Sequence, residues 1–326
     1  MATVLVTGSA GFIGFSLARK LLNEGHQVIG IDNLNSYYDV KLKEDRLSIL
    51  QNELPKKNSF IFQKLDLIES GELHHLIENY EFDYVYHLAA QAGVRYSIQN
   101  PDSYFESNVR GTFNLLESLR KKPPKKLILA STSSIYGESS LSKLSEDVEV
   151  NPIQFYAATK EIDEIMCNMY SLIYNLDITV FRFFTVYGPW GRPDMSLFKF
   201  VRRIINKEPI EIYNNGKHRR SFTYIDDVVY YLMKAIESGE EEKGFQIYNL
   251  GNPKSVDLLE FVAIIEKELK IKSTIEFLPL QFGDVTGSSP DITKLITKFG
   301  KIEFTKVEEG VTKFINWYKS YKNLSN

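Results

Sequence analysis

Residues able to remove a proton from an alcohol stand close together between positions 130 and 160. The apolar run Leu127–Ala130 indicates a buried strand, and Thr132 follows it at the expected carboxyl end. Tyr156 comes 24 residues after Thr132, and Lys160 is four residues further on at the start of a helical pattern, so the phenol and the ammonium share one helix face. An ammonium beside a phenol stabilises the phenolate, which makes the tyrosine a usable base near pH 7. These three residues are the predicted catalytic group.

The Tyr-x-x-x-Lys spacing by itself is weak evidence. It starts at Tyr37, Tyr156, Tyr213, Tyr230 and Tyr318. Among these, Tyr156 alone opens a strong helical pattern and follows a strand that ends in hydroxyl residues. An ordinary exposed helix pair is the alternative, and it is disfavoured if the amino terminus supplies the cofactor that alcohol oxidation requires.

A glycine-rich turn at the amino terminus predicts a dinucleotide site. The short apolar strand Val4–Thr7 precedes three glycines at intervals of three, and an amphipathic helix continues through Leu22. Glycines let the backbone approach a pyrophosphate, and the helix N-terminus holds that anion with its free N–H groups and its positive dipole end. The expected contacts at this turn are Gly8, Gly11, Phe12, Ile13 and Gly14.

An acidic residue at the end of the second predicted strand indicates which dinucleotide binds. Asp32 follows the strand Gln27–Ile31 and stands 18 residues after Gly14. A carboxylate there accepts hydrogen bonds from the adenosine ribose and repels a 2′-phosphate, so NAD is predicted rather than NADP; the alternative is a loop residue that starts a turn. The other expected cofactor contacts follow the second, third and fourth strands and are Asn33, Asp66, Leu67, Leu88, Ala89 and Ala90.

Strands and helices alternate along residues 1–184, which predicts an α/β fold with a doubly wound parallel sheet and a ligand at the carboxyl ends of its strands. Helices are expected at 40–52, 108–120 and 156–175. The segment Arg182–Met195 has too much glycine and proline for a helix or strand, and its aromatic and charged residues are typical of a loop that builds a site.

Two lobes follow from this pattern. We predict a Rossmann-type NAD-binding domain at residues 1–184, with a segment at about 225–250 that returns to its sheet. Residues 185–224 and 251–326 are expected to form a smaller α/β substrate-binding lobe, in which Arg219–Tyr224 is one of the predicted strands.

Composition excludes several classes of protein. The net charge of −3 is close to balanced and the lysines and arginines are scattered, so neither nucleic acid nor a membrane surface is an expected partner. No apolar run reaches about 18 residues, and the first residues lack the features of a signal peptide. The single cysteine, Cys167, excludes a disulfide framework and a thiolate zinc cluster, so no metal is expected and the predicted location is cytoplasmic.

With these motifs in place, nearly the whole chain resembles the extended short-chain dehydrogenase/reductase family of nucleotide-sugar enzymes. Three longer strings are most similar to the branch that inverts C4 of UDP-glucuronate, namely Gly30–Asp39, Ala89–Ser97 and Arg182–Asp194. The resemblance implies a tightly held NAD, a UDP-sugar substrate in the second lobe, and a homodimer formed by the helices around residues 103–119 and 156–175. It also implies that UDP-glucuronate and UDP-galacturonate interconvert through a transient 4-keto sugar without net oxidation.

The resemblance further implies roles for single residues. Tyr156 would take the proton of the sugar C4 hydroxyl, Thr132 would hold that hydroxyl, and Lys160 would bind the nicotinamide ribose. Arg192 would pair with the C5 carboxylate, because a guanidinium fork fits a carboxylate bidentately. The other implied substrate contacts are Arg95, Ser133, Ser134, Thr185, Arg220 (at the diphosphate) and Asp284.

Several alternatives stay open. A 4-keto uronic acid loses carbon dioxide readily, and related decarboxylases carry Glu at the position of Ser134, while related dehydratases carry Asp-Glu at Ser133 and Ser134. The two serines argue against both activities and would instead hold the carboxylate still. A 4-epimerase of a neutral or N-acetylated UDP-hexose is the main alternative. A non-catalytic NAD-binding regulator of the same fold conflicts with the complete catalytic group.

Overall fold

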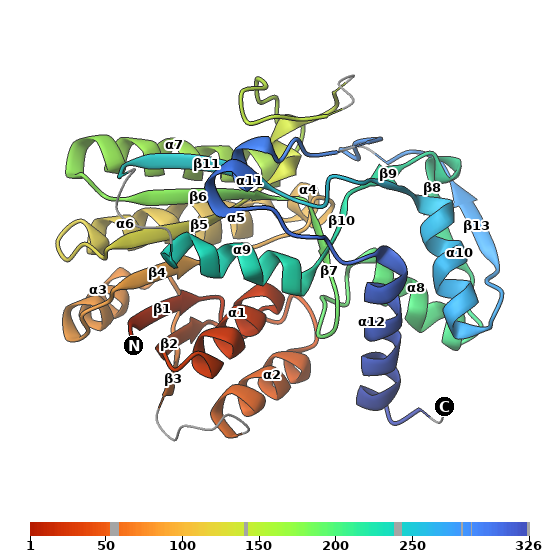
Figure 1. Ribbon diagram of the computed structural model, residues 1–326, viewed down its shortest axis with the longest axis horizontal. Helices are drawn as coiled ribbons and strands as arrows, with labels where there is room; N and C mark the ends of the chain where they lie inside the picture. The colour runs from red at the N-terminus through yellow and green to blue at the C-terminus, as the bar shows by residue number, and fades with distance from the viewer. Residues whose placement is uncertain (53–58, 140–142, 238–242, 282, 288, 325–326) are drawn as a thin grey trace.

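The computed structural model describes residues 1–52, 59–139, 143–237, 243–281, 283–287 and 289–324. A seven-stranded parallel sheet with the order β11-β6-β5-β4-β1-β2-β3 forms the centre of the larger lobe (Figure 1). Its strands are β1 (Thr3–Thr7), β2 (Gln27–Asp32), β3 (Phe60–Lys64), β4 (Tyr84–His87), β5 (Lys126–Thr132), β6 (Ile178–Phe183) and β11 (Phe245–Leu250).

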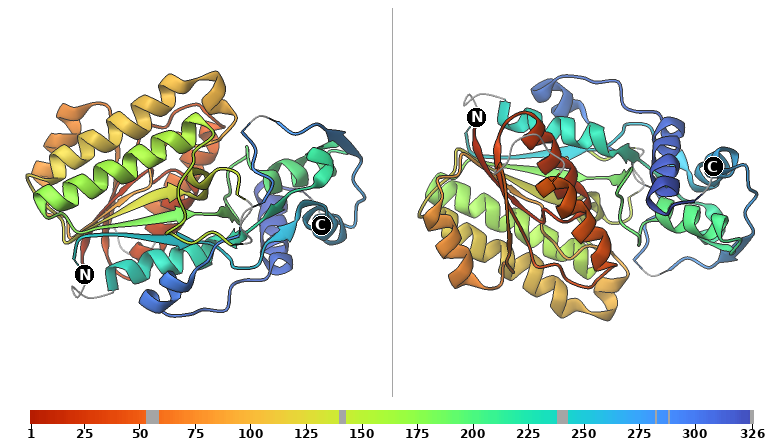
Figure 2. Two further views of the ribbon diagram at one scale, coloured as in Figure 1. Left: turned by 90° about the horizontal axis from the view of Figure 1, so that it is seen from above. Right: turned by 90° about the horizontal axis from the view of Figure 1, so that it is seen from below.

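Layers of helices cover both faces of the central sheet (Figure 2). Neighbouring residues of each central strand pack against opposite layers. In β1, Val4 and Val6 belong to one buried cluster and Leu5 belongs to the other, because side chains alternate across a strand. One layer contains α1 (Phe12–Asn23), α2 (Val40–Asn52) and α9 (Ile225–Glu237). The other contains α3 (Ser70–Asn79), α6 (Gly111–Leu119) and α7 (Phe155–Tyr174). The predicted doubly wound parallel sheet is confirmed.

The helix predicted at 108–120 begins earlier than the sequence pattern suggested. Short α4 (Tyr96–Gln99) precedes α5 (Pro101–Tyr104), which continues through a π-helical segment, η1 (Phe105–Arg110), into α6. Pro101 occupies the first helical turn, where its missing N–H costs no hydrogen bond. The Asn100 side chain accepts a hydrogen bond from Ser103 N at 3.4 Å and caps the helix.

The smaller lobe combines three helices with pairs of short strands. Its core includes Phe222 and Phe261, whose rings stack at 3.9 Å. The helices are α8 (Ser196–Ile205), α10 (Leu258–Leu269) and α12 (Val307–Tyr321). The strands are β7 (Thr185–Tyr187), β8 (Ile210–Tyr213), β9 (Arg219–Arg220), β10 (Phe222–Tyr224), β12 (Val256–Asp257) and β13 (Ile275–Leu278), and η3 (Asn214–Gly216) is a short 3₁₀ turn. A second 3₁₀ turn, η2 (Ser133–Tyr136), directly follows β5 in the larger lobe.

Two predictions for this region were wrong. The segment Arg182–Met195 is not wholly irregular, because Thr185–Tyr187 forms β7 and pairs in parallel with β10, a partner far along the chain. The predicted strand Arg219–Tyr224 is divided at Ser221, whose hydroxyl donates to Asn252 O at 2.7 Å. Both differences depend on contacts that are distant in sequence.

Later segments return to the main sheet. Strand β11 pairs with β6 at the sheet edge, and α9 packs against α1. Helix α11 (Thr293–Phe299) packs against β11 and α9, although the sequence pattern placed it in the second lobe. Among the described helices, none combines the length and apolar character needed to cross a bilayer.

Candidate active site

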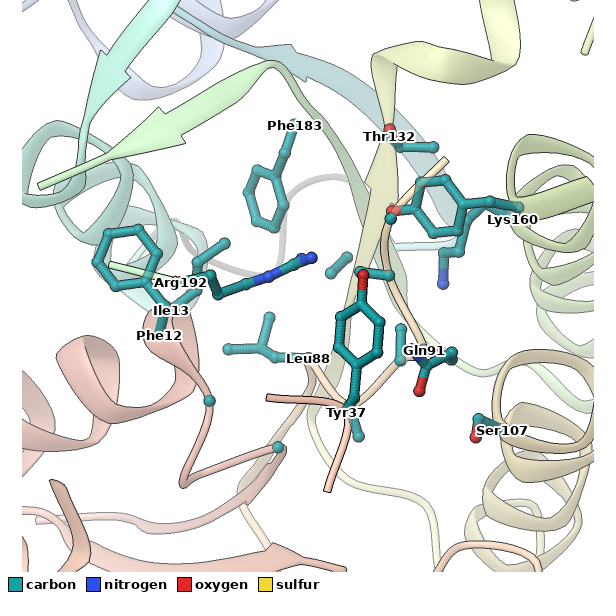
Figure 3. Close-up of a pocket in the computed structure, with 18 of the residues that line it drawn as sticks. Phe12, Ile13, Tyr37, Leu88, Gln91, Ser107, Thr132, Lys160, Phe183 and Arg192 are labelled. Atoms are coloured by element: carbon teal, nitrogen blue, oxygen red, sulfur yellow. The ribbon is translucent and has the colours of Figure 1, made fainter. Parts of the chain in front are cut away.

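A cavity of about 420 Å³ lies where the carboxyl ends of the central strands meet the second lobe, and its volume is in the range of ligand pockets. Every residue that the sequence proposed for the site lines it, except Arg95. The cavity therefore joins the glycine-rich turn, the ends of β2 to β5, the start of α7 and the loop after β7. Figure 3 shows Thr132 and Lys160 on one side of this cavity and Arg192 reaching in from the other.

The turn between β1 and α1 has no room for side chains at its glycines. Gly8 has a φ of +70°, and a Cβ on it would lie 2.8 Å from Ala89 N. A Cβ on Gly14 would lie 2.1 Å from Gly8 O. Gly11 is the N-cap of α1 and has no side chain to cap it, and Phe12, Ile13 and Gly14 of the first helical turn line the cavity. This arrangement fits the pyrophosphate of a dinucleotide.

Polar side chains close the turns after β2 and β3. Asp32 accepts hydrogen bonds from Leu34 N at 2.8 Å and Ala10 N at 3.2 Å, and burial raises its pKa while Lys43 acts in the opposite direction. Asn33 Nδ2 donates to Asp66 Oδ2 at 2.8 Å, which joins the ends of the two strands. Asp32 therefore both orders its loop and faces the cavity.

The predicted catalytic residues converge as expected. Thr132 Oγ1 accepts from Ser134 N at 3.1 Å, which holds the hydroxyl at the tip of β5. Tyr156 and Lys160 line the cavity from the first turns of α7, and the Tyr156 ring packs edge-on against Tyr104 with centroids 6.0 Å apart. A hydroxyl, a phenol and a buried ammonium in one cavity are suited to proton removal from an alcohol.

The loop after β7 presents Arg192 to the cavity and is fixed from behind by Arg46. The Arg46 guanidinium is fully buried and donates to Ala10 O at 2.8 Å and Trp190 O at 2.6 Å. One side chain thus ties the glycine-rich turn to the loop. Arg192 donates from Nε to Asp194 Oδ1 at 3.0 Å and from Nη2 to Asp194 Oδ2 at 2.5 Å. Burial acts to raise the pKa of Asp194, but the charge and hydrogen bonds of Arg192 lower it below its ordinary value.

The other two predicted arginines differ in position. Arg220 lines the cavity and donates from Nη2 to Val285 O at 2.7 Å, and burial lowers its pKa. Arg95 lies outside the lining, where Nη2 donates to Asp284 Oδ2 at 3.0 Å and the guanidinium lies 4.2 Å from the centre of the Tyr213 ring. Asp284 does line the cavity, so Arg95 contacts the site through that carboxylate.

Sequence reasoning missed several site residues. Tyr37, Lys43, Gln91 and Ser107 line the cavity, and Asp194 binds Arg192. Three of the five lie within the longer strings that carry the family resemblance, which was the available signal for Tyr37, Gln91 and Asp194. Lys43 and Ser107 lie within helices and have no motif of their own. In the described part of the chain, no group of three or more His, Cys, Asp or Glu side chains is placed to hold a metal ion.

The fold and this site define the class of protein. Residues 4–251 match the model of the NAD dependent epimerase/dehydratase family, and the chain belongs to that family. It is 42% identical to Protein CapI of Staphylococcus aureus over 337 residues, which covers 98% of each chain. It is also 42% identical to a UDP-glucuronate 4-epimerase of Thermodesulfobacterium geofontis, with 98% of this chain and 97% of the relative covered.

A solved structure extends the comparison to three dimensions. The UDP-glucuronic acid 4-epimerase of Bacillus cereus, crystallised with UDP-glucuronic acid and NAD, superposes with a TM-score of 0.92 at 31% identity. The match covers 98% of this chain and 99% of that one. The structural similarity therefore extends over both lobes.

Proposed function

We propose that the protein interconverts UDP-glucuronate and UDP-galacturonate by inverting C4 of the sugar. The observation that carries the proposal is that Arg192 lies in the same cavity as Thr132, Tyr156 and Lys160. A guanidinium there can receive a sugar carboxylate while the other three residues act on the C4 hydroxyl. The named relatives of the same length support this substrate.

The chain's own residues divide the chemistry between them. When bound along the glycine-rich turn, NAD supplies the acceptor and later the donor of hydride, so that C4 becomes a ketone and is reduced again on its other face. Tyr156, as phenolate, takes the C4 hydroxyl proton in the first half of the reaction and returns it in the second. Lys160 supplies the positive charge that favours the phenolate, and Thr132 orients the hydroxyl.

Holding the sugar carboxylate is a separate task. A 4-keto uronic acid is a β-keto acid, so its carboxylate must be kept where the bond to it cannot align with the ketone. Arg192, Ser133, Ser134 and Thr185 line the cavity and offer a guanidinium and three hydroxyl donors for this purpose. The second lobe supplies Arg220 for the diphosphate, so the larger lobe would hold NAD and the smaller one the UDP part.

A second candidate is a 4-epimerase of a neutral or N-acetylated UDP-hexose. The Arg192–Asp194 ion pair favours it, because the carboxylate already compensates the guanidinium charge. In that case Arg192 would not discriminate between sugars.

The test is to incubate the purified protein, without added NAD, with UDP-glucuronate, UDP-glucose or UDP-N-acetylglucosamine, and to resolve the products by anion-exchange chromatography and mass. A new peak of unchanged mass from UDP-glucuronate alone is expected. A product from a neutral sugar alone would replace the first candidate with the second, and loss of 44 mass units, the mass of carbon dioxide, would indicate a decarboxylase.

We also propose a homodimer through α7 and the adjacent helices. Along α7, Ile165, Leu172 and Ile173 are 55%, 67% and 65% exposed, and Phe105 and Phe113 of the neighbouring helical segment are 44% and 46% exposed. Figure 2 shows α6 and α7 side by side on one face of the sheet. An apolar surface of two adjacent helices is suited to a four-helix bundle with a second copy.

A cytosolic location is part of the same proposal. Cys167 is a free, fully buried thiol, and burial raises its pKa. A single inert thiol is consistent with a reducing compartment.

A further inference from the structure

A buried carboxylate contacts the catalytic lysine from outside the cavity. Asp163 is three residues after Lys160 on α7, and Lys160 Nζ lies 2.5 Å from Asp163 Oδ2. The two side chains are 2% and 0% exposed, respectively. Lys160 lines the cavity and Asp163 does not, so the ammonium has the carboxylate on one side and the substrate site on the other.

The other charged groups near Asp163, Glu164 and Arg182, form an ion pair with each other. Glu164, the next residue on α7, accepts hydrogen bonds from Arg182 Nη2 at 2.8 Å and from Ser131 Oγ at 2.5 Å. These two hydrogen bonds of Glu164 connect α7 to β6, through Arg182, and to β5, through Ser131. Arg182 is therefore compensated by Glu164, and the cation that faces Asp163 is Lys160.

The remaining neighbours are uncharged near neutral pH. Thr112 of α6 and Cys167 of α7 face Asp163, and burial raises the pKa of the Cys167 thiol. His87 of β4, which faces Lys160, is fully buried, and burial lowers its pKa to about 3. Asp163 Oδ1 is buried and makes no hydrogen bond of normal geometry with the described residues. The Lys160 contact is thus the main compensation of this carboxylate.

Burial raises the pKa of Asp163 to about 6, while the charge of Lys160 acts in the opposite direction. For Lys160, burial lowers the pKa, but Asp163 and Tyr156 together raise it above its ordinary value. The ion pair is consequently intact at neutral pH. Burial therefore brings protonation of this carboxylate closer to neutral pH than for an exposed aspartate, while the lysine keeps its charge.

We propose that Asp163 is a positioning residue that holds Lys160 in place and offsets part of the charge that Lys160 exerts on Tyr156. This inference rests on the proposed function, because it concerns the pH range over which Tyr156 serves as base. Ionised Asp163 weakens the stabilisation of the phenolate. Protonated Asp163 leaves the full charge of Lys160 acting on Tyr156, which preserves the base as the pH falls.

The size of the effect follows from the helix. Tyr156 and Asp163 are seven residues apart on α7, which corresponds to roughly 10 Å along the axis and to nearly the same helix face. At an effective dielectric constant of about 20, one unit charge at that distance moves an ionisation midpoint by on the order of one pH unit.

The experiment compares Asp163→Asn with the unaltered protein and with Glu161→Gln. Glu161 is next to Lys160 in sequence but half-buried at the surface, so its replacement removes the same charge without touching the buried pair. Phenolate formation is followed by ultraviolet absorbance as the pH is raised, and the Tyr156→Phe spectrum is subtracted at each pH. The midpoint of the Tyr156 signal is expected to fall by about one pH unit in Asp163→Asn. It is expected to move much less in Glu161→Gln, because solvent screens a charge at the surface.

Asp163→Ser is a second neutral variant, for which the same fall of the Tyr156 midpoint is expected. It replaces Asp163→Asn in the experiment if the asparagine variant does not fold. A purely structural role for Asp163 would change stability in both variants but leave the midpoint in place, and an unchanged midpoint in the folded variants overturns the inference. The pH profile of kcat with UDP-glucuronate is measured in parallel. Because the absorbance titration needs no sugar, a shifted midpoint without uronate turnover would reject the proposed substrate and leave the role of Asp163 standing.

Discussion

Replacing Arg192 by alanine is expected to separate acidic from neutral sugars, and the structure indicates by how much. Arg192 lines the cavity and is held by two hydrogen bonds to Asp194 at 3.0 and 2.5 Å. A hydrogen bond to a charged group contributes about 1.5–3 kcal/mol, so its loss lowers kcat/KM for UDP-glucuronate roughly 10- to 150-fold. This part of the effect requires only that the guanidinium contacts the sugar carboxylate.

The carboxylate of Asp194 adds a second contribution to the loss of kcat/KM for UDP-glucuronate. Without Arg192, Asp194 remains beside the cavity with Tyr37 as a hydrogen-bond partner at 3.3 Å, and its charge repels the sugar carboxylate. At roughly 8 Å and an effective dielectric constant of about 20, this repulsion is about 2 kcal/mol, or a further factor on the order of 10 to 30. The total loss expected for UDP-glucuronate is therefore on the order of 100- to 1,000-fold or more, whereas UDP-glucose should change less than about 10-fold.

The assay is kcat/KM for each sugar by anion-exchange chromatography. The double variant Arg192→Ala with Asp194→Asn lacks both the guanidinium and the carboxylate that repels the sugar. Its kcat/KM for UDP-glucuronate should therefore be about 10-fold higher than that of the single variant Arg192→Ala. Equal losses on UDP-glucuronate and UDP-glucose would remove Arg192 from sugar recognition. An absence of recovery in the double variant would refute the electrostatic part of the reasoning.

Three further outcomes are expected. Tyr156→Phe should lower turnover at least about 100-fold while NAD released on denaturation stays equal to that of the unaltered protein, and near-normal turnover would exclude Tyr156 as the base. Burial lowers the pKa of His87 from 6.5 to about 3, so its contribution to stability is complete above pH 6.5 and is lost as the pH falls toward 3. Between pH 7 and pH 5, the free energy of unfolding measured in urea should therefore fall by about 2 kcal/mol more in the unaltered protein than in His87→Gln. An identical pH dependence in both proteins would contradict this expectation. Leu172→Lys with Ile173→Lys should give a monomer by light scattering if these exposed side chains form the dimer surface.

The local elements of the fold were predictable because their signals lie within short stretches of chain. Periodicity predicted α2 at 40–52 with the bounds that the structure has, and the helix predicted at 156–175 differs from α7 by one residue at each end. The glycine-rich turn was equally readable, since the conformation of Gly8 and the contact of Gly14 with Gly8 O are set within one turn of the chain. That Tyr156 and Lys160 share one helix face followed from helix geometry alone.

What the sequence could not show are the partners that each site residue has. Local patterns do not reveal that Arg46 ties Ala10 to Trp190, a residue 144 positions away, or that Arg95 turns aside to Asp284. The strand β7 was missed for the same reason, because three residues become a strand only when β10 supplies their hydrogen bonds.

The sequence by itself determined the class of fold, the dinucleotide turn and the choice of residues proposed to carry the chemistry, since these depend on residue type and on spacing along one strand or helix. The tertiary structure decided the electrostatic setting of those residues. Asp163 has no motif, yet its buried position on α7, facing Thr112 of α6, makes it the buried counterion of Lys160. Burial and charge pairing depend on how separate elements pack, and packing is a property of the whole chain rather than of any one segment.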